Sequence, residues 1–179
     1  MQILAIAAPA QQTAMYEWLA AAFRTWKPMP YFTAPLAFLF SYPWDEAIHQ
    51  RNLALLDEKI AEWKPNAQER GGGAMVNLLN QREKTMQQIH ASQEDIISFW
   101  HSHWDVPYAH DQTLKTLMAA EKWTEAIEQV KADLQTFAGE YMPCKQRREQ
   151  LILLYQRANQ PDLAQREIRQ YIEQYNQYS

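Results

Sequence analysis

The sequence is poor in glycine and nearly free of cysteine, and each shortage removes a class of protein. Only four of the 179 residues are glycine, so tight turns are expected to be few. We find no sustained alternation of apolar and polar residues of the kind that indicates a sheet. The single cysteine excludes an internal disulfide framework and favours a reducing compartment. An all-α, cytoplasmic protein is therefore expected.

The chain also lacks a strong charge of either sign. Its formal net charge is −4 and its isoelectric point is near 5.7, which gives no electrostatic reason to expect nucleic acid or an anionic membrane as a partner. Residues 1–9 are mostly apolar but lack the Lys or Arg residues that open a secretory signal, so no such signal is expected. The uncharged stretch 28–44 is interrupted by prolines and is too short to span a membrane.

A helical period of apolar residues recurs along the whole chain and predicts a helical bundle. In the N-terminal half we expect helices over residues 9–26, 43–64 and 74–90, and a further helix that begins after residue 92. Ser92 followed by Asp95 is typical of a capping box, which marks the start of this further helix.

Residues 28–43 are rich in both proline and aromatic side chains, and two interpretations stay open. The prolines oppose a regular helix, while the rings are too apolar for a solvated loop. The segment therefore either plugs the core as a loop or short helix, or presents its rings to a partner. In the second interpretation, the partner-binding rings are Tyr31, Phe32, Phe38 and Phe40.

From residue 111 onward, the sequence predicts two antiparallel helix hairpins that repeat each other. A shift of 38 residues places Ala120 on Ala158 and Ala126 on Ala164. Small residues at such positions let two antiparallel helices approach closely. These alanines are therefore expected where the helices of each pair cross.

Two segments of the hairpins, Lys122-Trp-Thr-Glu-Ala-Ile and Gln160-Pro-Asp-Leu-Ala, resemble the tetratricopeptide repeat family. The spacing is longer than the ~34 residues of that family, and Glu121 and Asn159 stand near the place of its glycine. The resemblance covers about one third of the chain. It implies a scaffold that binds a peptide or protein in a concave groove and has no chemistry of its own.

These patterns divide the chain into an N-terminal helical region, residues 1–110, and the repeat-like hairpins, residues 111–179. We expect the two to pack as one compact unit. Tyr171, Tyr175 and Tyr178 fall on one face of the last helix. This face either packs inside the bundle or forms the contact of a homodimer.

Charge is divided unevenly between the two hairpins. Residues 111–140 carry three Lys and six Asp or Glu, whereas residues 141–179 carry six Lys or Arg and four Asp or Glu. The acidic excess of the first group is either a set of solvated helix faces or a surface that steers a basic partner.

One segment is dense in side chains that can bind a metal: His101, His103, Asp105 and His110. Imidazole and carboxylate ligands suit zinc, iron or manganese. Residues two apart point in different directions on a continuous helix, so a site here needs the helix to end near Trp100. The alternative is a polar helix end, where histidines interact favourably with the helix dipole.

The sequence favours a protein–protein interaction module over an enzyme. It would act as an adaptor, chaperone or inhibitor-type (immunity-type) partner, bind a protein or peptide of basic character, and need no cofactor. The competing hypothesis is a small metal-dependent enzyme built on the His and Asp cluster at 101–111.

Overall fold

The computed structural model describes residues 9–26, 34–64 and 72–175. These residues fold into nine helices and no strand, which confirms the all-α prediction. None of the described helices is long and apolar enough to cross a membrane. The contacts group the chain into two compact units, residues 1–91 and 92–179, where the sequence predicted one unit with an internal boundary after residue 110.

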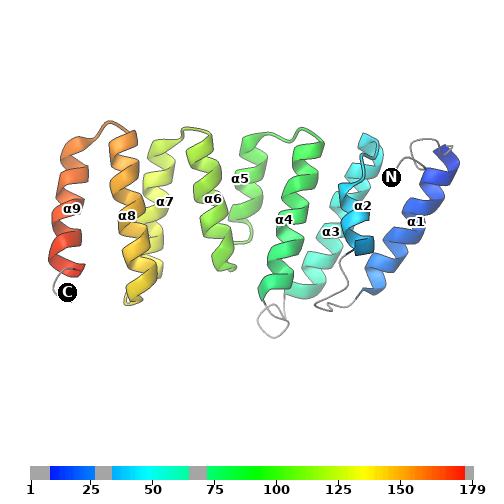
Figure 1. Ribbon diagram of the computed structural model, residues 1–179, viewed down its shortest axis with the longest axis horizontal. Helices are drawn as coiled ribbons and strands as arrows, with labels where there is room; N and C mark the ends of the chain where they lie inside the picture. Colours follow the sequence, from blue (N-terminus) through cyan, green and yellow to red (C-terminus); the bar gives the residue numbers. More distant parts are fainter. Residues whose placement is uncertain (1–8, 27–33, 65–71, 176–179) are drawn as a thin grey trace. The chain divides into compact units, whose positions relative to one another are not determined.

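The first unit contains the helices α1 (Pro9–Thr25), α2 (Ala34–Ser41), α3 (Glu46–Trp63) and α4 (Gly72–Gln88). Helix α1 packs against α2 and α3, and α3 packs against α4 (Figure 1). Helix α3 begins later than the sequence predicted because Asp45 caps it. The Asp45 carboxylate accepts a 2.8 Å hydrogen bond from the backbone N–H of Ile48, which supplies a partner for a helix-end donor.

Aromatic rings build the core of the first unit. Phe40 of α2 is 4% exposed and lies edge-on to Phe23, with the ring centroids 5.1 Å apart. Trp26 stacks on Trp63 at 5.2 Å. Such ring pairs stabilise the fold beyond what burial of the rings alone provides. The described part of the 28–43 segment therefore plugs the core as a short helix, which was the first of its two interpretations.

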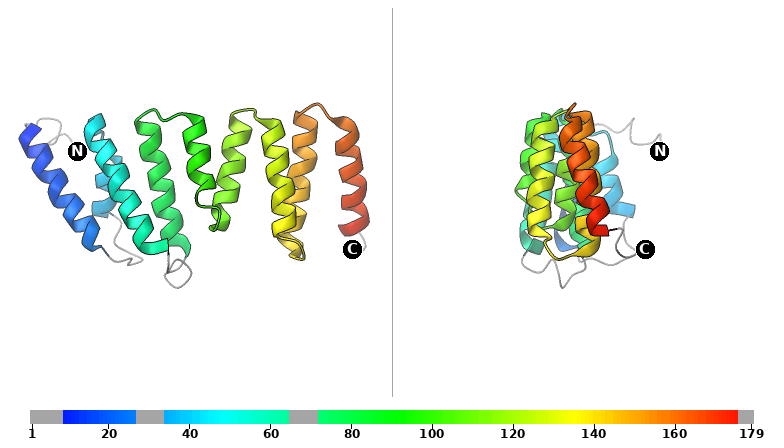
Figure 2. Two further views of the ribbon diagram at one scale, coloured as in Figure 1. Left: turned by 180° about the vertical axis from the view of Figure 1, so that it is seen from behind. Right: turned by 90° about the vertical axis from the view of Figure 1, so that its left-hand side faces the viewer.

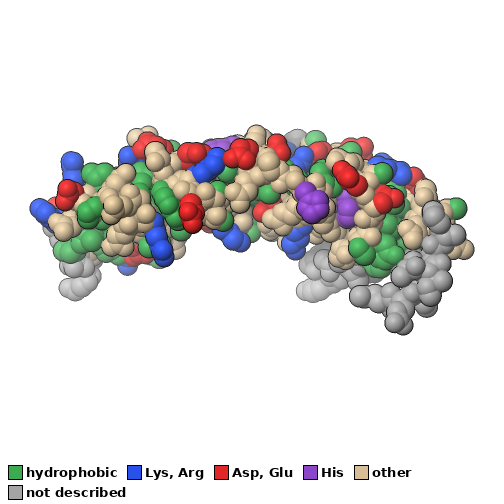
Figure 3. All heavy atoms as spheres, turned by 90° about the horizontal axis from the view of Figure 1, so that it is seen from above, with side chains coloured by type: hydrophobic (Ala, Val, Ile, Leu, Met, Phe, Trp, Pro, Cys, Tyr) green, Lys and Arg blue, Asp and Glu red, His purple; other side chains and the backbone are tan. Residues whose placement is uncertain are grey.

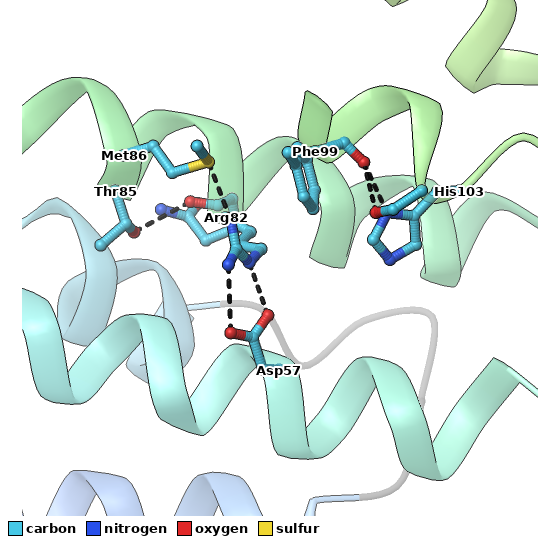
Figure 4. Close-up of polar contacts among 8 residues, drawn as sticks. Asp57, Arg82, Thr85, Met86, Phe99 and His103 are labelled. Carbon is cyan, nitrogen blue, oxygen red and sulfur yellow. Dashed lines mark hydrogen bonds and ion pairs between the residues drawn. The ribbon is translucent and has the colours of Figure 1, made fainter. Parts of the chain in front are cut away.

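Charged side chains join neighbouring helices of the first unit. The Lys59 ammonium donates hydrogen bonds of 2.8 Å to the Arg24 carbonyl oxygen and to the Glu62 carboxylate, so a cation lies at the C-terminal end of α1, where the helix dipole favours it. Arg82 of α4 faces both carboxylate oxygens of Asp57 on α3, at 2.5 and 3.1 Å (Figure 4). A bidentate pair of this kind fixes the orientation of both side chains.

His49 makes the stability of the first unit depend on pH. Its ring is buried, and this burial lowers the pKa of His49 against the opposing influence of Asp45. An unfolded histidine titrates near pH 6.5. As the pH falls below about 6.5, the unfolded state therefore binds the proton first, and the free energy of unfolding decreases. Above that pH His49 is neutral in both states and its contribution to stability is complete.

We expect the His49→Gln variant to lose less stability than the wild type when the pH is lowered from 7 to 5. The measurement is urea unfolding of the full chain at several pH values, compared as the change in free energy for each protein. Comparing changes rather than absolute values removes the effect of the substitution on packing. Equal losses in the two proteins would contradict the assignment of this pH dependence to His49.

The second unit contains the helices α5 (Gln93–His101), α6 (Pro107–Ala119), α7 (Trp123–Thr136), α8 (Tyr141–Arg157) and α9 (Pro161–Tyr175). Each helix packs against the next in chain order, and successive helices alternate in direction (Figures 1 and 2). The predicted capping box of Ser92 and Asp95 is present at the start of α5. The unit boundary falls after residue 91 rather than residue 110 because α5 packs against α6.

Three of the four alanines predicted at the helix crossings pack into the core of the second unit, and the fourth, Ala120, is half-buried. Ala126 is 0% exposed and Ala164 is 3% exposed, and Ala158 packs against the same hydrophobic cluster. This cluster is formed by the buried residues Ile97, Leu114, Leu117, Ala126, Ile127, Val130, Leu151, Leu154, Tyr155 and Ala164. The two antiparallel hairpins, α6–α7 and α8–α9, therefore share one core.

Three helices end in the same backbone turn, and none of the three uses glycine. His90 after α4, Glu121 after α6 and Asn159 after α8 have φ values of 56°, 55° and 56°. After α6, the N–H of Lys122 donates to the carbonyl oxygen of Leu117 at 3.0 Å. The residue after the left-handed one makes the corresponding bond at the ends of α4 and α8. This pattern is the Schellman motif, in which glycine usually takes the left-handed position.

We expect Glu121→Gly to raise the free energy of unfolding by about 0.5–1 kcal/mol. The left-handed conformation strains an ordinary side chain, while glycine loses more chain entropy on folding, so only part of the strain is recovered. Asn159→Gly is the matched control, because asparagine adopts this conformation more easily. Urea unfolding measures both variants, and an equal gain in the two would contradict the explanation by strain.

Candidate functional site

An open groove of about 580 Å³ lies between α6 and α8 of the second unit. The two helices run in the same direction, and α7 runs in the opposite direction (Figure 2). The volume is within the ~300–1,000 Å³ that is typical of ligand-binding clefts. The groove is lined by Asp111, Leu114, Lys115, Met118, Gln146, Arg147, Glu149, Gln150 and Leu153.

One groove residue, Arg147, is held by a fully buried carboxylate. Asp133 of α7 is 0% exposed. Its Oδ2 lies 2.8 Å from the Nε of Arg147, and its Oδ1 lies 2.6 Å from the Nδ1 of His110 and accepts a 2.9 Å hydrogen bond from Gln129. We call Asp133, His110, Gln129 and Arg147 the Asp133 network. It joins α6, α7 and α8 through a single carboxylate, which needs such partners because it is removed from water.

All three nitrogens of the Arg147 guanidinium have partners. Besides the contact of its Nε with Asp133, Nη1 donates to the Gln150 side-chain oxygen at 2.7 Å, and Nη2 lies 2.7 Å from the Asp111 carboxylate. The Arg147 side chain is only 7% exposed. Asp111, Arg147 and Gln150 all line the groove, so this part of its wall is fixed before any ligand binds. Such preorganisation reduces the entropy that binding costs.

The groove also combines an apolar side chain with an oriented carboxylate. Leu153 is 41% exposed and lines the groove, so it offers an apolar surface to a molecule that enters the groove. The Glu149 carboxylate accepts a 2.6 Å hydrogen bond from the Tyr171 hydroxyl of α9. This bond raises the pKa of Tyr171 to about 12, so the hydroxyl remains a donor at neutral pH and holds Glu149 at the groove.

Charges of both signs surround the groove. Lys and Arg side chains are interspersed with Asp and Glu side chains over the second unit in the space-filling view (Figure 3). The exposed carboxylate of Asp111 and that of Glu149 lie among the groove residues, together with the exposed ammonium of Lys115.

The structure does not bring the predicted metal ligands, His101, His103, Asp105 and His110, together as one centre. Helix α5 does end at His101 and the chain does turn there, as that hypothesis required. However, the Nδ1 of His103 lies 2.9 Å from the Phe99 carbonyl oxygen (Figure 4), and both ring nitrogens of His110 face oxygen atoms of other residues. Within residues 9–26, 34–64 and 72–175, no group of three or more His, Cys, Asp and Glu side chains is arranged to hold a metal ion.

The predicted partner-binding rings do not form an exposed set either. Phe40 is buried in the core of the first unit, because α2 turns its ring toward α1, so its assignment as an exposed anchor is corrected. Phe38 is half-buried and lies 5.2 Å from the ring of Tyr42. Tyr31 and Phe32 lie outside the described residues.

Sequence reasoning missed the two central residues of the Asp133 network. Asp133 is followed by Leu134, and of two such neighbours the apolar one is expected to face the core. The structure buries Asp133 completely and leaves Leu134 partly buried. An acidic residue one turn after Val130, on the apolar face of the helix, was the available signal. Arg147 gave no local signal, since its two carboxylate partners, Asp111 and Asp133, lie on other helices.

Comparison with known proteins adds no family to this description. No protein-family model, no curated protein and no solved structure matches the chain. The function is therefore inferred from the groove and from the side chains that form it.

Proposed function

We propose that this chain is a cytoplasmic protein–protein interaction module that binds a peptide segment of another protein in the groove between α6 and α8. It would act as an adaptor, chaperone or inhibitor-type partner and would catalyse no reaction. The observation that carries the proposal is the groove itself. Its volume is about 580 Å³, one wall is fixed by the ion pairs of the buried Arg147 guanidinium, and Leu153 remains exposed in it.

The side chains in the groove suit a peptide better than a small polar ligand. Leu114, Met118 and Leu153 recur along the two helices, which supports apolar anchors spaced along an extended or helical segment. Methionine adapts its shape to different partners. Gln146 and Gln150 add amide groups that can both donate and accept hydrogen bonds, as the backbone of a bound peptide requires.

The resemblance to the tetratricopeptide repeat family supports the same proposal. In that interpretation, α6–α7 and α8–α9 are two repeat-like hairpins, and α6 and α8 are the first helices of each. The buried alanines Ala126 and Ala164, which a shift of 38 residues superimposes, favour it. A concave groove is the binding surface that the resemblance implies.

We propose a partner of basic character. Residues 111–140 carry three Lys against six Asp or Glu, and the exposed acidic residues among them include Glu121, Glu125, Glu128 and Glu140. An acidic surface steers a basic segment toward the groove and raises the association rate at low salt. Arg147 contributes little to this field because two carboxylates already neutralise it.

The test is selection from a phage-displayed library of random peptides against the full chain. We expect enriched peptides with apolar residues at a regular spacing and a net positive charge. Their affinity should fall at least tenfold in Leu153→Asp, because a carboxylate in the groove cannot replace an apolar contact. Leu163→Asp is the matched control: Leu163 is 42% exposed on α9 and does not line the groove.

Two results would overturn the proposal. One is the failure of any peptide to enrich on the wild-type chain. The other is a set of enriched peptides that bind Leu153→Asp as tightly as the wild type. Circular dichroism of both variants shows that each remains folded, so that a loss of binding reports on the groove.

A further inference from the structure

One histidine fastens the turn between α5 and α6 to the rest of the second unit. His110 is 3% exposed. Its Nε2 lies 3.1 Å from the backbone carbonyl oxygen of Trp104, which belongs to the turn, and its Nδ1 lies 2.6 Å from the Asp133 carboxylate of α7. A single imidazole ring therefore connects the turn to α7.

Both partners of the ring are hydrogen-bond acceptors. A backbone carbonyl oxygen cannot donate a hydrogen bond, and neither can an ionised carboxylate. The other neighbours of the Asp133 carboxylate are Gln129 and Arg147, both of which present N–H groups. These donors require Asp133 to accept, so His110 must supply the proton between its Nδ1 and Asp133.

Only the imidazolium form of His110 satisfies both contacts. A neutral imidazole carries one N–H group, so one of its nitrogens would place a lone pair against an oxygen atom. A buried polar contact left unsatisfied in this way costs free energy. If the remaining proton stays on Nδ1 beside Asp133, the contact that is lost is the one to the Trp104 carbonyl.

The aromatic surroundings favour the same charged form. The rings of His110 and Trp104 have centroids 3.6 Å apart, and an indole face attracts a cation. Phe137 lies on the ring as well, with its centroid at 5.5 Å. The ring of Trp104 therefore lies next to the charge on His110, and a signal from this ring can report a change in that charge.

We propose that His110 is a proton-operated lock on the α5–α6 turn. With both ring nitrogens protonated, it holds the Trp104 carbonyl and the Asp133 carboxylate together. When His110 loses a proton as the pH rises, the turn is released, while Asp133 retains Arg147 and Gln129. The proposal does not depend on peptide binding in the groove.

Other charged groups lie near His110, and any test must distinguish their effects from the effect of His110. They are Asp133 on α7, Arg147 on α8, Asp111 beside His110 on α6, Asp105 in the turn, and His101 at the end of α5. His101 is the closest competitor as a source of a titration, since its ring stacks on Trp104 with centroids 5.1 Å apart. It is exposed and makes a suitable control.

The first measurement is nitrogen-15 NMR of the histidine rings in the wild-type chain between pH 5 and pH 9. We expect both ring nitrogens of His110 to carry protons at the acidic end and one of them to lose its proton as the pH rises. A ring that is singly protonated throughout would overturn the proposal. Because this measurement uses the wild-type chain, it stands even if variants of His110 fail to fold.

The second measurement follows Trp104 by fluorine-19 NMR in the chain labelled with 5-fluorotryptophan, with Trp104→Phe used to assign the signal. We expect the Trp104 signal to shift with the same midpoint as the His110 nitrogens. The shift should persist in His101→Asn and disappear in His110→Gln. Persistence of the shift in His110→Gln, or its loss in His101→Asn, would overturn the proposal.

The release of the turn is tested by hydrogen exchange. The amide of Val106 donates to the His103 carbonyl oxygen at 2.9 Å within the turn, and the amide of Lys122 makes a comparable bond at the end of α6. Hydroxide catalyses the exchange of both amides, so taking the ratio of the two exchange rates removes the pH dependence that they share. We expect the ratio of Val106 to Lys122 to rise at least fivefold across the His110 titration. A constant ratio would show that protonation does not control the turn.

Discussion

Asp133→Asn should lower the free energy of unfolding of the second unit by about 3–5 kcal/mol. The substitution keeps the size and shape of the side chain but removes the negative charge to which His110 and Arg147 are paired. Removal of one partner of a buried ion pair leaves the other charge uncompensated, and this residual charge is the main cost. Arg147 retains Asp111 as a second carboxylate, which places the expected loss at the lower part of the range.

The measurement is urea unfolding of the full chain, followed by circular dichroism and by fluorescence. Glu128→Gln provides the control on the same helix, because Glu128 forms an ion pair with Lys131 at the surface. Exposed pairs contribute about 0–1 kcal/mol. If Asp133→Asn lost no more stability than Glu128→Gln, the buried Asp133 network would contribute no more to stability than a surface ion pair.

Leu154→Ala is expected to cost about 2–5 kcal/mol, the range observed when a buried leucine is truncated. Leu154 is 0% exposed and belongs to the cluster shared by the two hairpins. Loss of its side chain removes apolar burial and leaves a cavity between helices that cannot move closer without disturbing the alanine crossings. The cost depends on how far this site can relax.

The neighbouring leucine provides a matched control for this substitution. Leu153 is 41% exposed in the groove, so Leu153→Ala should change stability by no more than about 0.5 kcal/mol. The same pair separates the two roles of α8, because Leu153→Ala should weaken the binding of selected peptides while Leu154→Ala should weaken folding. A cost for Leu153→Ala as large as that for Leu154→Ala would contradict the placement of Leu153 at the surface.

Local patterns in the sequence predicted most of the helical architecture. The apolar period identified the long helices, the capping box marked the start of α5, and the alanines identified the crossings at Ala126 and Ala164. Each of these signals involves residues within a few turns of one another. The start of α3 was misplaced because Pro43 and Asp45 both suit a helix start, and only the hydrogen bond to Ile48 distinguishes them.

The candidate site was harder to predict because its contacts join residues on different helices. His110 drew attention as a metal ligand, yet its partner Asp133 lies 23 residues away, and no local pattern links the two. Phe40 is of a residue type that is common at binding surfaces, but the packing of α2 places its ring in the core. Such pairings depend on how helices rotate about their axes, which the apolar period fixes only approximately.

The order in which helices contact one another in the second unit has a consequence for how it folds. Because each helix packs chiefly against its neighbours in the chain, most contacts close short loops, and chains with such local contacts fold quickly. Stability in a linear stack is the sum of each hairpin and its interfaces. Helix α9, which packs chiefly against α8, should therefore open and close many times without unfolding the helices that precede it.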